Sequence, residues 1–143
     1  MWFERAAVQQ PAVDAPVVLL VERHNSLRHL LDELLTEAGY RVLEAGSRPA
    51  LLGQLREATR VDVIVTDTGL RLPGWEVVQE ATGAWPGVPV VRLVGSAADA
   101  VPVYGEDPST MTLVTKPFVI TELLEVLDRL VPTRRPRRAR WSR

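Results

Sequence analysis

The sequence has no cysteine, a single lysine and no long apolar segment. Without cysteine it cannot form a disulfide framework, a thiolate metal site or a thiol nucleophile. No apolar run approaches the roughly 18–20 residues that a membrane span requires, and residues 1–16 lack the apolar core of a secretory signal. These absences predict a cytoplasmic protein without a membrane span.

Charge is unevenly spread along the 143 residues, although 17 cations and 18 acids give a formal net charge of only −1. Residues 134–143 hold six arginines and no acid, so the other 11 cations and the 18 acids leave −7 on the rest of the chain. We predict a basic, disordered tail over residues 132–143. Contact of this tail with an anionic surface such as nucleic acid, and its docking on the acidic body of a second copy or of a partner, are alternatives to a freely solvated end.

A change in the hydropathy pattern marks one domain over residues 17–131, after a flexible leader at 1–16. Hydrophobic residues make up 46% of the chain, which is enough for a buried core. Apolar runs typical of strands buried on both faces alternate with segments of helical spacing. Strands are expected at 17–21, 41–45, 61–66, 89–94 and 110–115, and helices at about 26–38, 47–58, 75–81 and 121–131, with a segment broken by proline and glycine at 96–109.

This alternation predicts a doubly wound parallel sheet with helices on both faces, whose working site lies outside the carboxyl ends of the strands. Glu22, Asp67 and Lys116 are expected at that edge. A carboxylate nucleophile beside a cation and a further acid suits phosphoryl transfer. For Asp67 or Lys116 alone, a loop cap or a solvated strand end is the more common explanation, so the prediction depends on their occurring together.

Five segments in this order resemble the receiver domain of bacterial two-component response regulators. They are Val-Leu-Leu-Val-Glu (18–22), Asp-Val-Ile-Val-Thr-Asp-Thr-Gly-Leu (62–70), Pro-Gly-Trp-Glu-Val (73–77), Val-Pro-Val-Val (88–91) and Lys-Pro-Phe (116–118). The resemblance implies a flavodoxin-like (βα)5 fold with strand order 2-1-3-4-5. It also implies phosphorelay signal transduction, with a sensor histidine kinase as partner and contact with other proteins, or a homodimer, as output.

The resemblance assigns roles to four positions. Asp67 matches the phosphoacceptor, Lys116 matches the lysine that pairs with it, and Gly69 matches the residue whose backbone carbonyl helps to hold Mg²⁺. Pro117 follows the peptide bond that is usually cis in the family. No enzymatic activity is expected beyond self-phosphorylation and autodephosphorylation at Asp67, and a stand-alone receiver is expected because no output domain follows residue 131.

Other positions depart from the family pattern. Receivers usually carry two acids after the first strand, whereas this sequence has Glu22 and Arg23. The hydroxyl that hydrogen-bonds the phosphoryl group is replaced by Val94, with Ser96 two residues further on as a substitute. The aromatic switch position is Leu113. The departures predict a degenerate metal site in an atypical receiver.

Two interpretations of the degenerate site remain open. In one, Glu22 and Asp67 bind Mg²⁺ weakly and Asp67 is phosphorylated with reduced efficiency. In the other, Arg23 replaces the metal, pairs with Asp67 or Glu22, and locks a pseudo-receiver that works only as an interaction module. A small flavodoxin-like phosphotransferase or flavin protein is a third alternative, but no glycine-rich phosphate loop supports it. His24 and His29 are expected to take no part in a metal site.

Overall fold

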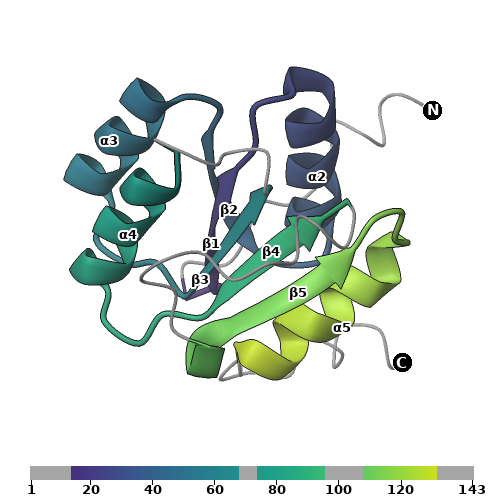
Figure 1. The fold of residues 1–143 in the computed structure, drawn as a ribbon. Helices are drawn as coiled ribbons and strands as arrows, with labels where there is room; N and C mark the ends of the chain where they lie inside the picture. Colours follow the sequence, from purple (N-terminus) through teal and green to yellow (C-terminus); the bar gives the residue numbers. More distant parts are fainter. Residues whose placement is uncertain (1–13, 68–73, 96–107, 132–143) are drawn as a thin grey trace.

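Strands and helices alternate along the chain in the computed structural model, which describes residues 14–67, 74–95 and 108–131 (Figure 1). The elements in chain order are β1 (Val17–Val21), α2 (Asn25–Glu37), β2 (Arg41–Ala45), α3 (Arg48–Glu57), β3 (Val63–Asp67), α4 (Gly74–Ala84), β4 (Val90–Val94), the 3₁₀ turn η2 (Pro108–Thr110), β5 (Met111–Thr115) and α5 (Ile120–Leu130). These strands form one parallel sheet in the order β2-β1-β3-β4-β5. The predicted flavodoxin-like (βα)5 fold and its strand order are confirmed.

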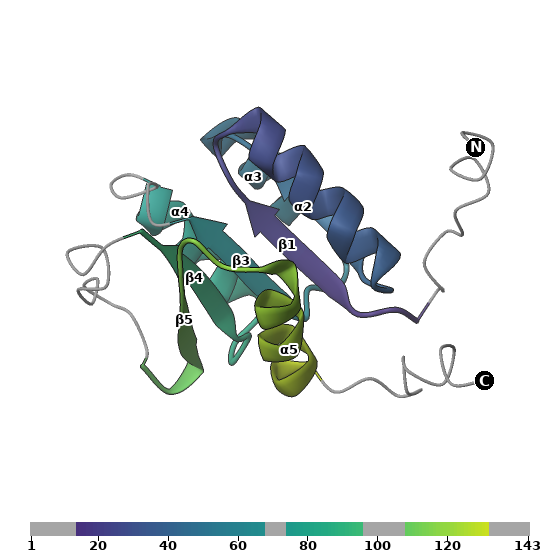
Figure 2. The same ribbon diagram turned by 90° about the vertical axis from the view of Figure 1, so that its right-hand side faces the viewer.

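Helices cover both faces of the sheet, α2 and α5 on one and α3 and α4 on the other (Figure 1, Figure 2). Successive side chains of a strand point to opposite faces. In β1, Val18 and Leu20 therefore enter the core beneath α2 and α5, whereas Leu19 and Val21 enter the core beneath α3 and α4. All of β1 is buried, which explains why its sequence is continuously apolar.

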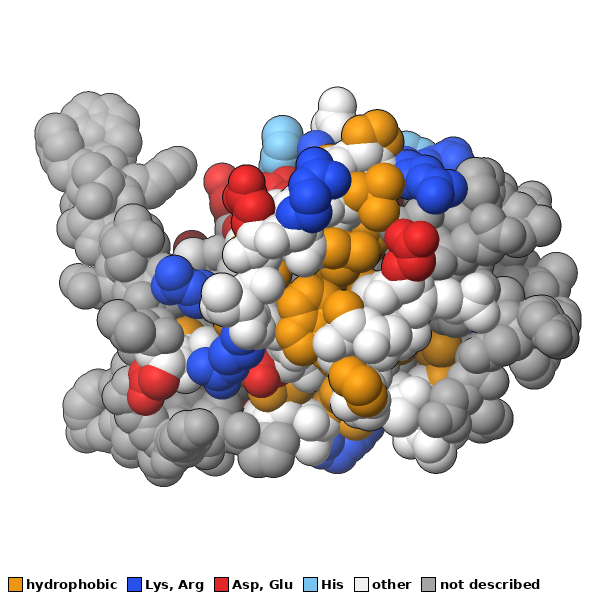
Figure 3. All heavy atoms as spheres, turned by 90° about the vertical axis from the view of Figure 1, so that its left-hand side faces the viewer, with side chains coloured by type: hydrophobic (Ala, Val, Ile, Leu, Met, Phe, Trp, Pro, Cys, Tyr) orange, Lys and Arg blue, Asp and Glu red, His pale blue; other side chains and the backbone are white. Residues whose placement is uncertain are grey.

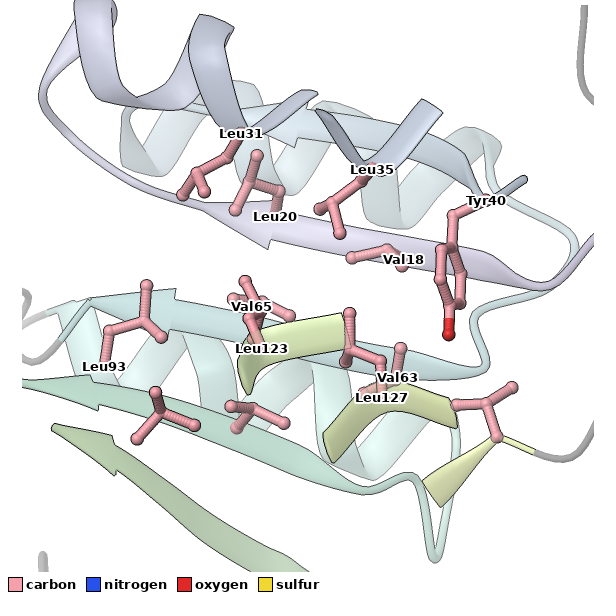
Figure 4. Close-up of a cluster of buried hydrophobic side chains, with 13 residues drawn as sticks. Val18, Leu20, Leu31, Leu35, Tyr40, Val63, Val65, Leu93, Leu123 and Leu127 are labelled. Atoms are coloured by element: carbon pink, nitrogen blue, oxygen red, sulfur yellow. The ribbon is translucent and has the colours of Figure 1, made fainter. Parts of the chain in front are cut away.

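The larger core lies between one face of the sheet and the two helices that cover it, α2 and α5 (Figure 4). Leu31 and Leu35 of α2 and Leu123 and Leu127 of α5 are all fully or almost fully buried in it. Burying one such leucine contributes about 1.5–3 kcal/mol. This packing holds the strands rigidly, so the residues at their carboxyl ends have fixed positions.

Figure 3 shows the side of the molecule that carries α3 and α4, opposite the side that carries α2 and α5. Apolar side chains form a band along the middle of this surface, and charged side chains flank the band. Among the residues described here, no helix combines the length and the apolar character needed to pass through a membrane.

Two helix ends, the start of α3 and the end of α2, follow common capping signals in the sequence. The Ser47 hydroxyl, before α3, accepts a hydrogen bond from a first-turn amide (3.2 Å). Gly39 follows α2 with a φ of 104°, in the left-handed region that glycine favours. α2 begins at Asn25, close to the predicted start, and its N-cap residue His24 makes no side-chain cap bond. His24 therefore lies between β1 and α2.

The bounds of β3 and α4 also differ from expectation. β3 begins at Val63, two residues later than predicted, and the Asp62 carboxylate just before it accepts a hydrogen bond from the Val17 amide at the start of β1 (2.7 Å). β3 also includes Asp67, and α4 continues to Ala84, three residues beyond the predicted end. Almost all of the predicted leader and the whole of the predicted tail lie outside the described residues.

Candidate functional site

The carboxyl ends of β1 and β3 place two carboxylates side by side. Val21 pairs with Thr66 in the parallel register, so the residues that follow them, Glu22 and Asp67, occupy equivalent positions at the sheet edge. Both are buried. The expectation that strand order would bring these two acids together is met.

Lys116 reaches the same edge from the end of β5. Its backbone amide donates a hydrogen bond to the Val94 carbonyl (2.7 Å), which continues the pairing with β4. Its Nζ donates to Asp67 Oδ1 at 3.2 Å. The Lys116 side chain is 31% exposed, so the cation contacts Asp67 from the solvent side. The Lys116–Pro117 peptide bond is cis, as the resemblance implied.

Glu22 has no access to solvent and one unsatisfied oxygen. Its side chain is 0% exposed. Oε2 accepts a hydrogen bond from the His24 amide (3.1 Å) and lies 3.0 Å from His24 Nδ1. Oε1 is buried and makes no hydrogen bond within the described residues. Leaving a buried acceptor unpaired costs about 1–3 kcal/mol, and more if it is charged.

His24 joins the two acids at this edge. One possible ligand atom from each of Glu22, His24 and Asp67 lies within 4.8 Å of the corresponding atoms of the other two. The expectation that His24 takes no part in a metal site stays a prediction, although the structure places its ring beside two carboxylates. That expectation looked for further histidines or cysteines, whereas the neighbours of His24 are carboxylates. Its position two residues after the buried acid was the signal in the sequence.

Arg23 lies between Glu22 and His24 but does not join them. Its side chain is exposed, and within the described residues no ion pair links it to either carboxylate. Lys116 contacts Asp67, and His24 contacts Glu22. The pairing of Arg23 with Asp67 or Glu22 is therefore absent from this structure. The backbone after β1 turns Glu22 inward, and the next side chain points outward.

Two of the remaining predicted positions lie within the described residues and two lie outside them. Val94 ends β4 and is buried, so no hydroxyl comes from this position. Leu113 is an exposed residue of β5. Gly69 and Ser96 lie outside the described residues.

Arg28, which the sequence analysis did not identify, holds the loop of the site in place. One of its guanidinium nitrogens donates to the Glu22 carbonyl (2.9 Å) and Nε donates to Glu44 Oε1 (2.9 Å). A Cβ on Gly46 would collide with the Arg28 guanidinium. The absence of a side chain at Gly46 therefore makes room for a cation that connects α2 to the ends of β1 and β2.

A second pair of carboxyl groups lies beside Arg28. Burial and a hydrogen bond with Glu44 raise the pKa of Asp32 to about 6. Burial acts to raise the pKa of Glu44 as well, but hydrogen bonds from Asp32 and Arg28 outweigh it and lower that pKa. His29 Nε2 lies 3.8 Å from Glu44 Oε1. The two acids therefore share a proton at mildly acidic pH.

A five-stranded parallel sheet of this order, with acids and a lysine at its carboxyl edge, defines the flavodoxin-like class of signalling folds. The family model for the response regulator receiver domain matches residues 18–128. The chain belongs to this family of two-component signalling domains.

Individual relatives show the same likeness. The chain is 25% identical over 115 residues to the response regulator receiver protein CpdR of Brucella abortus. The matched stretch covers 80% of this chain and 95% of the relative. The chemotaxis response regulator CheY4 of Vibrio cholerae has a similar structure, with a TM-score of 0.69, 26% identity and coverage of 82% of this chain and 99% of that one. A response regulator receiver protein from Sinorhizobium medicae is also similar, with a TM-score of 0.66 and 25% identity. The match covers 83% of this chain and 96% of that one.

Proposed function

We propose that Asp67 accepts a phosphoryl group from a phosphohistidine of a sensor kinase, and that the domain passes the signal on by contact with other proteins. The observation that carries the proposal is the Asp67–Lys116 pair at the carboxyl edge of the sheet. The likeness to receiver proteins over most of the chain supports it.

The proposed transfer uses two side chains of this site. A carboxylate oxygen of Asp67 attacks the phosphorus of the phosphohistidine and forms a new P–O bond. The P–N bond breaks, its electron pair stays on the imidazole nitrogen of the kinase, and that ring keeps or takes up a proton. Lys116 Nζ, already at Asp67, pairs with the phosphoryl oxygens as a compact charge on a flexible stem.

The donor set at this edge does not fit Mg²⁺. That ion requires near-octahedral coordination by oxygen atoms at about 2.0–2.1 Å. Here one of the three clustered groups is an imidazole, and the exposed Arg23 stands where the family has its second acid. The transfer described above therefore involves no step at Mg²⁺.

The output of the domain is proposed to be contact with other proteins rather than turnover of a substrate. Leu113 of β5 and Val119, just before α5, are large exposed apolar residues. They offer apolar contact area in β5 and at the start of α5. Reactions other than phosphorylation of Asp67 and loss of that phosphate are not proposed. The homodimer and the anionic surface for the basic tail remain predictions.

An intact-mass measurement tests the proposal. The full chain is incubated with a small phosphoramidate or acyl phosphate, separately with Mg²⁺, Mn²⁺ and chelator. We expect a gain of one phosphoryl group that is absent in Asp67→Asn and retained in the control Asp32→Asn, whose carboxyl lies in the other acidic pair. No gain under any condition would favour an unphosphorylated interaction module, and a gain that persists in Asp67→Asn would place the acceptor elsewhere.

A further inference from the structure

We propose that Glu22, His24 and Asp67 bind a first-row transition-metal dication, with Co²⁺ and Zn²⁺ held more tightly than Mg²⁺. The inference deepens the proposed function and rests on it for its consequence, the reaction of Asp67, but the binding itself is measured without a phosphodonor. In this proposal His24 supplies the ligand that the second acid would supply if Arg23 were an aspartate or glutamate.

The spacing of the three side chains suits a single ion. Bonds of about 2.1 Å place neighbouring ligand atoms of one metal about 3 Å apart. His24 Nδ1 and Glu22 Oε2 are 3.0 Å apart, and an atom of Asp67 lies within 4.8 Å of the cluster. Small rotations of side chains, without movement of the sheet, bring all three to one ion.

The buried Glu22 carboxylate provides a second, independent indication. Its side chain has no access to solvent, and Oε1 makes no hydrogen bond within the described residues. A buried anion is costly unless a cation or hydrogen bonds compensate it. Lys116 Nζ donates its hydrogen bond to Asp67 Oδ1. A dication beside Glu22 and Asp67 satisfies the unpaired oxygen and offsets the second negative charge.

The chemistry of the donors selects the kind of ion. Carboxylate oxygens suit Mg²⁺ and Mn²⁺, whereas imidazole suits the later transition metals, and Mg²⁺ takes oxygen ligands. Affinity at nitrogen and oxygen sites rises from Mn²⁺ through Co²⁺. The His24 side chain is 71% exposed, so an ion enters from solvent without opening the core.

Metal titration of the full, metal-free chain tests the proposal. Co²⁺ binding is followed by visible absorption, and Zn²⁺ and Mg²⁺ by competition and calorimetry. We expect Co²⁺ and Zn²⁺ to bind at least about tenfold more tightly than Mg²⁺, and His24→Ala to reduce that ratio by about tenfold or more while the Mg²⁺ affinity is unchanged. His29→Ala is the matched control, because His29 is an exposed histidine next to the other acidic pair.

A direct readout removes dependence on the variants. In NMR spectra of the wild-type chain, Co²⁺ is expected to shift the ring signals of His24 before those of His29. Equal affinity for Co²⁺ and Mg²⁺, or an unchanged ratio in folded His24→Ala, would overturn the proposal, as would loss of the site in His29→Ala. If Co²⁺ binds at His24 but Asp67 is never phosphorylated, the proposed function fails and the metal site stands. If Asp67 is phosphorylated but His24→Ala changes no metal affinity, the metal site fails and the proposed function stands.

Discussion

The molecule contains two clusters of the same composition, and they differ in nearly every other respect. Each has two acids, one histidine and one cation: the edge cluster is Glu22, Asp67, His24 and Lys116, and the α2–β2 cluster is Asp32, Glu44, His29 and Arg28. In the edge cluster the acids are buried and the cation is a lysine. In the α2–β2 cluster the acids are half-buried and the cation is an arginine with two fixed hydrogen bonds.

This difference shows that composition alone does not define a site. Lysine is a point charge that can follow a group added to Asp67, whereas the planar guanidinium of Arg28 is held by Glu44 and the Glu22 carbonyl. The edge cluster is therefore suited to bind and react, and the α2–β2 cluster is suited to hold the β1–α2 loop in place. The edge cluster depends on the α2–β2 cluster, since Arg28 contacts the backbone of Glu22.

The largest expected effect is on the reaction rate that the cation of the edge cluster supports. Lys116→Gln should slow phosphorylation of Asp67 by about 10²-fold, since removal of one aligned donor to a developing charge costs that much in other sites. Intact-mass time courses with a small phosphodonor measure the rate. Arg60→Gln is the control, because Arg60 pairs with Asp62 and lies at the opposite ends of the strands. Equal rates in the wild type and Lys116→Gln would contradict the role given to Lys116.

Only part of the edge cluster could be predicted from the sequence: Asp67 and Lys116 were, and His24 was not. Asp67 and Lys116 follow apolar runs whose ends are evident in the hydropathy pattern, so the parallel topology was enough to bring them together. His24 was missed because its contact with Glu22 depends on the turn between β1 and α2. There His24 adopts an extended φ and ψ of −77° and 114° as the N-cap. Arg23 was assigned to the site by position in the sequence, but that turn directs it outward.

The α2–β2 cluster cannot be predicted from the spacing of apolar and polar residues along the sequence. Arg28 and Glu44 are 16 residues apart, and helical spacing identifies Arg28 only as a polar position. Their contact requires the rotation of α2 over the sheet and the register of β2 on β1. Gly46 signals the contact only after the position of the guanidinium is known.

The next effect tests the two cations by stability. Arg28→Met should lower the free energy of unfolding by about 1–3 kcal/mol, because two charge-assisted hydrogen bonds are lost and a partly buried Glu44 is left with fewer partners. Chemical denaturation measures this change. Gly46→Ala should produce a loss in the same direction by displacing the guanidinium. Lys116→Gln should change stability by less, and a larger loss in Lys116→Gln than in Arg28→Met would reverse the comparison.

A smaller effect is expected from restoring the missing acid. Arg23→Asp places a carboxylate at the family position and should raise the Mg²⁺ affinity about tenfold, since it adds an oxygen donor near two acids. The preference for Co²⁺ over Mg²⁺ should narrow accordingly. Calorimetry of both ions measures the change, and Arg48→Asp at the start of α3 is the control for net charge. An unchanged Mg²⁺ affinity would show that position 23 remains outside the edge cluster even as an acid.

The smallest effect is the pH dependence of stability that the α2–β2 cluster contributes. The pKa of Asp32 is raised from 3.8 to about 6 in the folded chain, so the folded state holds a proton that the unfolded state has released. Its contribution to stability is complete below about pH 4 and is lost as pH rises through about 6. The lowered pKa of Glu44 acts in the opposite direction at more acidic pH. Denaturation midpoints from pH 4 to 8 should therefore show a decline that Asp32→Asn removes. The decline should persist in His24→Ala, because His24 belongs to the other cluster.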